Sequence, residues 1–243
     1  MKKILLLGLI FLLVFLIYLC NIDKKVYYLA LGDSLAYGEG AYGKKVSGYT
    51  SIVKDYLKEQ GILEVYVDEF AQSGYRTTDL INDIEDNKKI VKGKKDITIK
   101  NALIKADLVT LSIGANDILN KINIENEAPY EKIYDYIDEL AIDLEKLLKL
   151  MREYSKEDII LIGYYNPYPY LNSNKIDNVF EYLNKKYREV CMEYKIYYVE
   201  IDDIFKENPE FLPNDYNIHP SEEAYKAIGN EVIGVINKTL LKS

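Results

Sequence analysis

The stretch Tyr28-Leu-Ala-Leu-Gly-Asp-Ser-Leu-Ala-Tyr37 decides the fold of this chain. It joins an apolar strand, predicted over residues 26–31, directly to a turn made by Gly32, Asp33 and Ser34. In α/β proteins, ligands bind just beyond the carboxyl ends of the strands. The pattern therefore places a serine hydroxyl where such a sheet presents its chemistry, although Gly-Asp-Ser is also ordinary turn chemistry.

Beyond this stretch, short apolar segments alternate with segments of helical periodicity. The patterns predict strands over 26–31, 63–71, 108–113, 159–164 and 196–201, and helices over 50–60, 79–84, 180–192, after Pro129 and after Ser221. Residues 88–95 are rich in lysine and are expected to form a charged loop. Repeated strand–helix units favour one three-layer α/β/α domain over residues 26–243, with a mostly parallel five-stranded sheet.

The amino-terminal segment differs from the rest. Residues 4–20 form an unbroken apolar or weakly polar run that follows Lys2 and Lys3. A secretory h-region has about 7–15 residues and a membrane span about 17–25, so this run fits a short span. The two lysines before the run predict that the amino terminus lies on the cytoplasmic side of the membrane. Leu19 stands where a lipoprotein site would need a small residue before Cys20. We expect residues 1–25 to be an uncleaved signal-anchor helix in the cell membrane, with the domain outside. Secretion after cleavage is the alternative.

The composition excludes several classes of function. The formal net charge is −8 and there is no basic stripe, so a nucleic-acid partner is not expected. Two cysteines and one histidine supply neither a disulfide framework nor a Cys/His metal site. We expect no cofactor and no metal. The oligomeric state does not follow from the sequence.

Four residues that could take part in a reaction lie at the predicted strand ends or beyond the last strand. They are Ser34, Gly74, Asn116 and His219. Taken singly, Gly74 and Asn116 are ordinary turn residues and His219 is a loop histidine. His219 is, however, the only histidine in the chain, so any serine–histidine chemistry must use it. The fold would gather all four at one edge of the sheet.

These residue types suit acyl transfer. A serine hydroxyl becomes a good nucleophile when a neighbouring base takes its proton. The developing oxyanion then needs donors, for which the N–H groups of Ser34 and Gly74 and the amide of Asn116 are suited. A helix that starts just after His219 would disfavour imidazolium and keep the base neutral.

Four motifs in order resemble the SGNH hydrolases, the GDSL esterase/lipase family. They are Gly32-Asp33-Ser34-Leu35, Ala71-Gln-Ser-Gly74, Gly114-Ala-Asn116-Asp117 and His219-Pro220, which look like blocks I, II, III and V. The resemblance covers the chain from Val26 onward. It implies a flavodoxin-like α/β/α domain and a metal-free Ser–His–Asp mechanism. It also implies that Ser34 is the nucleophile, that Gly74 and Asn116 complete the oxyanion hole, and that His219 is the base.

The last block departs from the family's pattern. The family usually has Asp-x-x-His, but the residue three before His219 is Tyr216. Asp215 lies four residues before His219 and Asn217 lies two before it. Two possibilities stay open: Asp215 completes a triad, or a backbone carbonyl orients His219 in a dyad.

The resemblance implies a serine esterase, and the expected anchor places it outside the cytoplasm. That surface location favours short acyl or O-acetyl esters, including those of cell-surface carbohydrate, as substrates. A lipase, lysophospholipase or thioesterase with the same site is the alternative among enzymes. From another class, a non-catalytic glycan- or lipid-binding module is possible. The segment Gly38-Glu-Gly-Ala-Tyr-Gly43 also matches the dinucleotide-binding pattern G-x-G-x-x-G, but Gly38 lies seven residues beyond the predicted strand, too far for that motif.

Overall fold

The centre of the protein is a parallel β-sheet. A computed structural model describes residues 25–119, 121, 130–169 and 174–241. Five strands lie in the order β2-β1-β5-β6-β7, and each neighbouring pair is parallel. Their bounds are β1 Val26–Gly32, β2 Leu63–Ala71, β5 Leu108–Ser112, β6 Asp158–Ile162 and β7 Tyr197–Val199. The predicted α/β class with five strands is confirmed.

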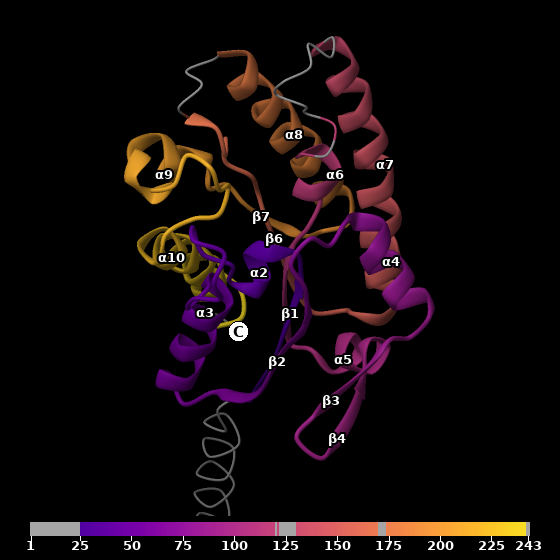
Figure 1. The fold of residues 1–243 in the computed structure, drawn as a ribbon. Coiled ribbons are helices and arrows are strands. Elements are labelled where there is room, and N and C mark those ends of the chain that lie inside the picture. The colour runs from indigo at the N-terminus through magenta and orange to yellow at the C-terminus, as the bar shows by residue number, and fades with distance from the viewer. Residues whose placement is uncertain (1–24, 120, 122–129, 170–173, 242–243) are drawn as a thin grey trace, which may run out of the picture.

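Helices cover both faces of this sheet, which gives the three layers visible in Figure 1. One face packs against α4 (Thr77–Glu85), α5 (Ile99–Lys105), α7 (Tyr130–Tyr154) and α8 (Asn174–Glu193). The other face packs against α3 (Tyr49–Glu59), α9 (Asp202–Glu207) and α10 (Glu222–Lys238). A 3₁₀ turn, η2 (Pro209–Phe211), follows α9.

The two covered faces explain why the central strand β1 is apolar along its length. In β1, Leu29 and Leu31 belong to the core under α4, α5, α7 and α8, while Tyr28 and Ala30 belong to the core under α3 and α10. Successive side chains of a strand point to opposite faces, so a sheet buried on both sides needs apolar residues at every position.

The chain order of the strands creates a crevice. From β1 the chain goes to β2 on one side and returns to β5 on the other side of β1. In such doubly wound sheets, ligands bind beyond the carboxyl ends of the strands where the order reverses. Two short helices start at that point, α2 (Ser34–Tyr37) after β1 and α6 (Ala115–Leu119) after β5. They carry Ser34 and Asn116.

The prediction of a charged loop over residues 88–95 is wrong. β3 (Lys89–Lys92) and β4 (Lys95–Thr98) form an antiparallel hairpin apart from the main sheet. Ile90 pairs with Ile97 across the hairpin, and both pack against the hydrophobic core. This cross-strand apolar pair stabilises the hairpin, although lysines dominate its composition.

Two element bounds also differ from the prediction. α8 starts at Asn174 and not at residue 180, because Ile176 and Val179 in its first turns are buried. β7 has only three residues. Elsewhere, the predicted strands and helices agree with the structure to within about two residues at most ends.

Within the described part of the chain, no helix is both long and apolar enough to cross a membrane. The expected anchor over residues 1–25 lies almost entirely outside the described residues. It therefore stays a prediction.

Candidate active site

The turn after β1 presents Ser34 at the first position of α2. The Cβ of an alanine at position 32 would lie 1.9 Å from the backbone oxygen of Ser112, and Gly32 has φ +127, so only glycine fits between β1 and β5. The Asp33 N–H donates to that same oxygen at 2.8 Å. The Asp33 carboxylate caps α2 by accepting from the Leu35 N–H at 3.1 Å, and it also accepts from the Ser112 hydroxyl at 2.8 Å.

Asp33 supports this turn from inside the protein. It is 2% exposed, and burial raises the pKa of its carboxyl to about 7, against the opposing effect of its hydrogen bonds with Ser112 and Leu35. Its Oδ1 atom accepts both of these hydrogen bonds, one from α2 and one from β5. Asp33 therefore fixes the turn that carries Ser34, and among the described residues no hydrogen bond or ion pair links it to His219.

The predicted oxyanion donors lie on neighbouring loops. Gln72 N–H donates to the Gly32 oxygen at 2.9 Å, which places the loop after β2 beside the turn that carries Ser34. The Asn116 amide nitrogen donates to the Tyr75 oxygen at 2.8 Å, so α6 holds the same loop from its other side. Among the described residues, no hydrogen bond engages the backbone N–H of Ser34 or Gly74. Donors without an internal partner are what an oxyanion site requires.

Asp117, the residue after Asn116, fixes α6 against α4. Its Oδ2 accepts from both the N–H and the hydroxyl of Thr77, at 3.0 and 3.2 Å. Burial raises the pKa of the Asp117 carboxyl, and the bonds to Thr77 oppose that effect. Like Asp33, this acid has a local structural partner.

His219 is held in one orientation by Asn217. The Oδ1 atom of Asn217 accepts from the His219 N–H at 2.9 Å and lies 2.6 Å from His219 Nδ1. An amide oxygen can only accept, so Nδ1 carries the ring proton and Nε2 keeps its lone pair. Burial lowers the pKa of His219 below its usual value, while the negative charge of Glu39 opposes this. The imidazole is therefore a neutral base at pH 7.

The cause of this neutrality differs in part from the expectation. α10 does begin just beyond His219, with Ser221 as its N-cap. Burial, however, is the main cause of the lowered pKa of His219. His219 and Ser34 line the same pocket, but no hydrogen bond joins them in the part of the chain that the structure describes. Such bonds often tighten only when substrate binds.

Asp215 makes no contact with the imidazole among the described residues. Its side chain is exposed, and among the described residues no hydrogen bond links it to His219. Within the described residues, the carboxylate at ion-pair distance from the ring is that of Glu39, whose Oε1 is 3.8 Å from Nδ1. Asp215 as the acid of a triad stays a prediction, and the sequence patterns had not singled out Glu39.

The loop before His219 is fixed by aromatic contacts. The Tyr165 hydroxyl donates to the Ile218 oxygen at 2.7 Å. The Tyr165 ring stacks on Phe205 of α9, with centroids 3.9 Å apart. These contacts hold the backbone next to His219 against the carboxyl end of β6.

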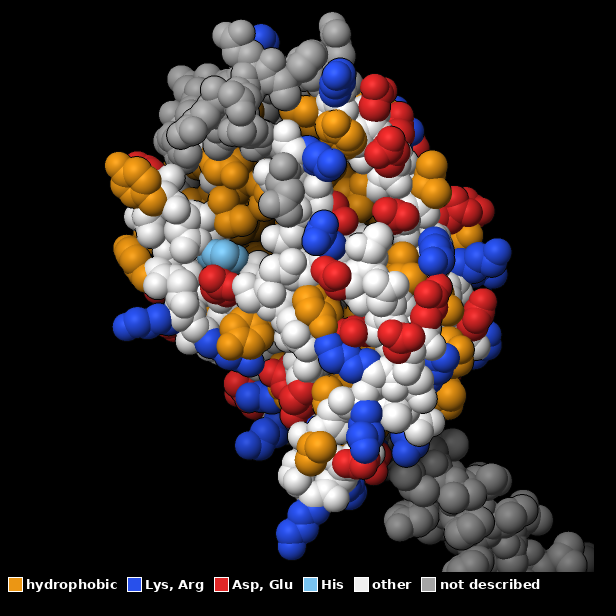
Figure 2. Space-filling model, turned by 45° about the vertical axis from the view of Figure 1, so that its right-hand side comes forward, with side chains coloured by type: hydrophobic (Ala, Val, Ile, Leu, Met, Phe, Trp, Pro, Cys, Tyr) orange, Lys and Arg blue, Asp and Glu red, His pale blue; other side chains and the backbone are white. Residues whose placement is uncertain are grey.

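A largely apolar pocket adjoins Ser34 and His219. Its cavity volume is about 40 Å³, it opens to solvent, and its wall includes Ser34 and His219. The apolar part of the wall is formed by Leu35, Ala115, Leu119, Pro167, Phe180 and Ile218. Figure 2 shows the histidine, in pale blue, beside a hollow with hydrophobic side chains in orange. An acyl chain bound at Ser34 would fit the chemistry of this wall.

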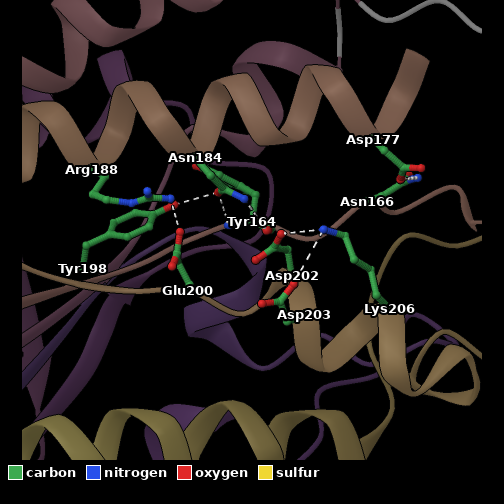
Figure 3. A network of polar contacts seen from close by, with 10 residues as sticks. All are labelled: Tyr164, Asn166, Asp177, Asn184, Arg188, Tyr198, Glu200, Asp202, Asp203 and Lys206. Carbon is green, nitrogen blue, oxygen red and sulfur yellow. Dashed lines mark hydrogen bonds and ion pairs between the residues drawn. The ribbon is translucent and has the colours of Figure 1, made fainter. Parts of the chain in front are cut away.

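Behind the pocket, a buried amide holds the end of β6. The Asn184 side chain of α8 accepts from the Tyr164 N–H and donates to the Tyr164 oxygen, both at 2.9 Å. It also accepts from the Tyr198 hydroxyl at 2.6 Å, as Figure 3 shows. Nearby, Asn166 donates to Asp177 at 2.8 Å. Sequence patterns missed Asn184 because it looks like one more polar residue on an amphipathic helix.

Known proteins support the same fold. A family model described as the GDSL-like lipase/acylhydrolase family matches residues 30–227. A lipase from a goat rumen metagenome superposes with a TM-score of 0.71 at 23% identity, covering 85% of this chain and 95% of that one. An acetylxylan esterase from Geobacillus stearothermophilus superposes with a TM-score of 0.64 at 20% identity, covering 89% and 96%. Catalytic mutants of that esterase replace a serine, a histidine and an aspartate by alanine. No curated protein matches this chain.

Proposed function

The chain belongs to the GDSL-like lipase/acylhydrolase family, and on that premise we propose that it is a serine esterase that hydrolyses short acyl or O-acetyl esters through an acyl-enzyme. One observation carries the proposal. The only histidine of the chain, oriented with Nδ1 protonated and Nε2 available, lines the same pocket as Ser34 at the sheet's switch point.

In the first half of the reaction, His219 Nε2 takes the proton of the Ser34 hydroxyl as Oγ bonds to the ester carbonyl carbon. The carbonyl electrons move to the oxygen, which becomes an oxyanion facing the N–H groups of Ser34 and Gly74 and the Asn116 amide. When the carbonyl reforms, the bond to the alcohol oxygen breaks. The alcohol leaves with the proton held by His219.

In the second half, water replaces the alcohol. His219 takes a proton from the water as its oxygen bonds to the acyl carbon. Collapse of this second tetrahedral intermediate breaks the bond to Ser34 Oγ, which regains the proton. The carboxylic acid is released and the enzyme returns to its starting state.

The substrate is proposed from the pocket and from the relatives. The apolar wall beside Ser34 suits the hydrocarbon part of an acyl group. The structural relatives include an acetylxylan esterase and a lipase, so both acetylated carbohydrate and lipid esters are candidates. Phe180 lines the pocket and is buried, which favours short chains. A lipase or thioesterase activity is the second candidate because the same wall is apolar.

We further propose that the domain over residues 26–243 works outside the cytoplasm, held at the cell membrane by the segment before it. The hydrophobic run over residues 4–20, preceded by two lysines, supports this location. The test is protease accessibility of the domain in intact cells compared with lysed cells. Protection in intact cells would contradict it.

Hydrolysis of p-nitrophenyl acetate, butyrate and octanoate by the full-length chain in detergent tests the esterase proposal. Ser34→Ala is expected to abolish turnover, and Ser47→Ala, at an exposed serine, is the matched control. A fluorophosphonate is expected to label the wild type and the control, but not Ser34→Ala. A folded chain that neither turns over any ester nor takes the label would refute the proposal. A binding module would then be the better explanation.

A further inference from the structure

Glu39 lies on the loop that leaves the nucleophile's helix, and its backbone is fixed from several sides. Gly38 ends α2 in the left-handed conformation, at φ +85, and so turns the chain back toward the site. The Glu39 N–H donates to the Ser34 oxygen at 3.0 Å. The hydroxyl of Tyr225, which is buried on α10, donates to the Glu39 oxygen at 2.7 Å.

The Glu39 side chain reaches from this loop to the imidazole. Its Oε1 is 3.8 Å from His219 Nδ1, and both side chains are largely buried, 20% and 15% exposed. Its Oε2 accepts a hydrogen bond from the hydroxyl of Ser73. Ser73 is the residue before Gly74, so one carboxylate connects the histidine loop to the loop of the predicted oxyanion donor.

The other polar groups on the elements around His219 are either bonded elsewhere or exposed. The carboxylate of Asp33, at the start of α2, is bonded to Ser112 and Leu35. The hydroxyl of Tyr165, on the loop after β6, donates to the Ile218 oxygen. Asp215, in the loop before His219 itself, has an exposed side chain. Among the described residues, only Glu39 forms an ion-pair contact with the imidazole.

We propose that Glu39 is the acidic positioning residue of this site: a carboxylate from the nucleophile's own loop that stabilises the imidazolium of His219, while Asn217 fixes its tautomer. This inference rests on the proposed serine esterase mechanism. It assigns the acid to a residue five positions after Ser34 and not to the segment before the histidine.

The division of labour follows from the contacts. Asn217 Oδ1 accepts the proton of His219 Nδ1 in a hydrogen bond and so orients the ring. The Asn217 amide is uncharged, so it supplies no negative charge to the ring. During turnover His219 becomes positively charged, and a nearby negative charge then stabilises it. Glu39 supplies that charge at ion-pair distance, and its negative charge raises the pKa of His219 against the effect of burial.

The first experiment reads His219 directly and needs no activity. Because the chain has one histidine, a histidine-selective NMR titration of untagged, full-length protein in detergent reports its pKa without assignment. Glu39→Gln is expected to lower the pKa of His219 relative to wild type. If Glu39 only held the local structure, its replacement would expose the ring of His219, and the pKa of His219 would rise toward its usual value.

Glu69→Gln is the matched control. Glu69 borders the same open groove as Glu39 but pairs with Lys92, so its loss is expected to leave the pKa of His219 unchanged. An unchanged pKa in Glu39→Gln would overturn the proposal. If Asp215→Asn lowered the pKa of His219 and Glu39→Gln did not, the acid would be Asp215.

The kinetic experiment then tests the role in turnover. Glu39→Gln is expected to lower kcat/KM for p-nitrophenyl acetate about 10- to 100-fold, less than the roughly 10⁴-fold loss seen where an acid also fixes the tautomer. The acid limb of its pH profile is expected at lower pH than in wild type, and Glu39→Asp should recover part of the rate. A wild-type rate in Glu39→Gln would overturn the proposal. Loss of the esterase proposal itself would show as an inactive wild type, whatever the NMR result.

Discussion

Replacing Asn184 by alanine tests the support of the pocket from behind. Asn184 is 3% exposed, and its amide bonds both the N–H and the oxygen of Tyr164 and accepts from the Tyr198 hydroxyl. Alanine would leave two buried backbone groups of Tyr164 without partners. Each such group costs about 1–3 kcal/mol, so the free energy of unfolding should fall by about 3–5 kcal/mol.

Urea unfolding followed by far-UV circular dichroism measures this effect, since the chain has no tryptophan to report by fluorescence. With an m-value of about 2 kcal/mol/M, the midpoint should fall by roughly 1.5–2.5 M. Asn237→Ala is the control, because that side chain accepts from Tyr56 at the surface, and its loss should cost less than about 1 kcal/mol. Equal midpoints for the two variants would refute the reasoning.

Three further predictions concern other parts of the fold. Gly32→Ala should destabilise the protein by more than about 4 kcal/mol, because the new Cβ would meet a backbone oxygen of β5. Gly234→Ala, in α10, places its Cβ in open space and should stabilise the protein by about 0.5–1 kcal/mol. Thermal unfolding of the two variants distinguishes these effects. The pKa of Asp33 is raised in the folded state, so as the pH rises from about 4 to about 7 the carboxyl ionises in the unfolded state first. Over this range the free energy of unfolding of wild type should fall by about 4 kcal/mol relative to that of Asp33→Asn. A pH-independent difference between the two unfolding free energies would contradict this. Burial raises the pKa of Cys191 to about 12, so in Cys20→Ser protein a thiol reagent should find no reactive cysteine until urea is added, and rapid native labelling would be the contrary result.

The sequence predicts the sheet well because its strands are buried on both faces. Runs such as residues 26–31 and 108–113 are mostly apolar, with only the small hydroxyl residues Thr110 and Ser112 interrupting the second, and the turn residues after them mark the strand ends. The hairpin β3–β4 could not be predicted in this way. Its stability comes from Ile90 and Ile97 packing on a core that forms elsewhere in the chain, and lysines hide that pair in the sequence.

Most of the candidate site could also be predicted. Ser34 and His219 are motif residues at or beyond strand ends, and the structure places both in the wall of one pocket. Asn116, from a third motif, holds the loop after β2 through the Tyr75 oxygen. Glu39 could not be found, because its distance to His219 depends on a loop that turns at Gly38 and is held by Tyr225, nearly the whole domain away in sequence. A search for the acid near the histidine in sequence points to Asp215, which the structure leaves exposed.

The direction of β1 has a consequence for how the protein meets its substrate. Val26 begins the strand at the amino edge of the sheet, and Ser34 follows its other end, about 20 Å away at roughly 3.3 Å per residue. In Figure 1 the strand runs from the lower end of the molecule toward α2. A surface that held the chain through the residues before Val26 would therefore lie at the amino-terminal edge of the sheet, opposite the edge that carries Ser34. The edge that carries Ser34 would then face the medium. On the proposed function, substrates would reach it from solution or from polymer above that surface, and lipids of the supporting bilayer would be out of reach.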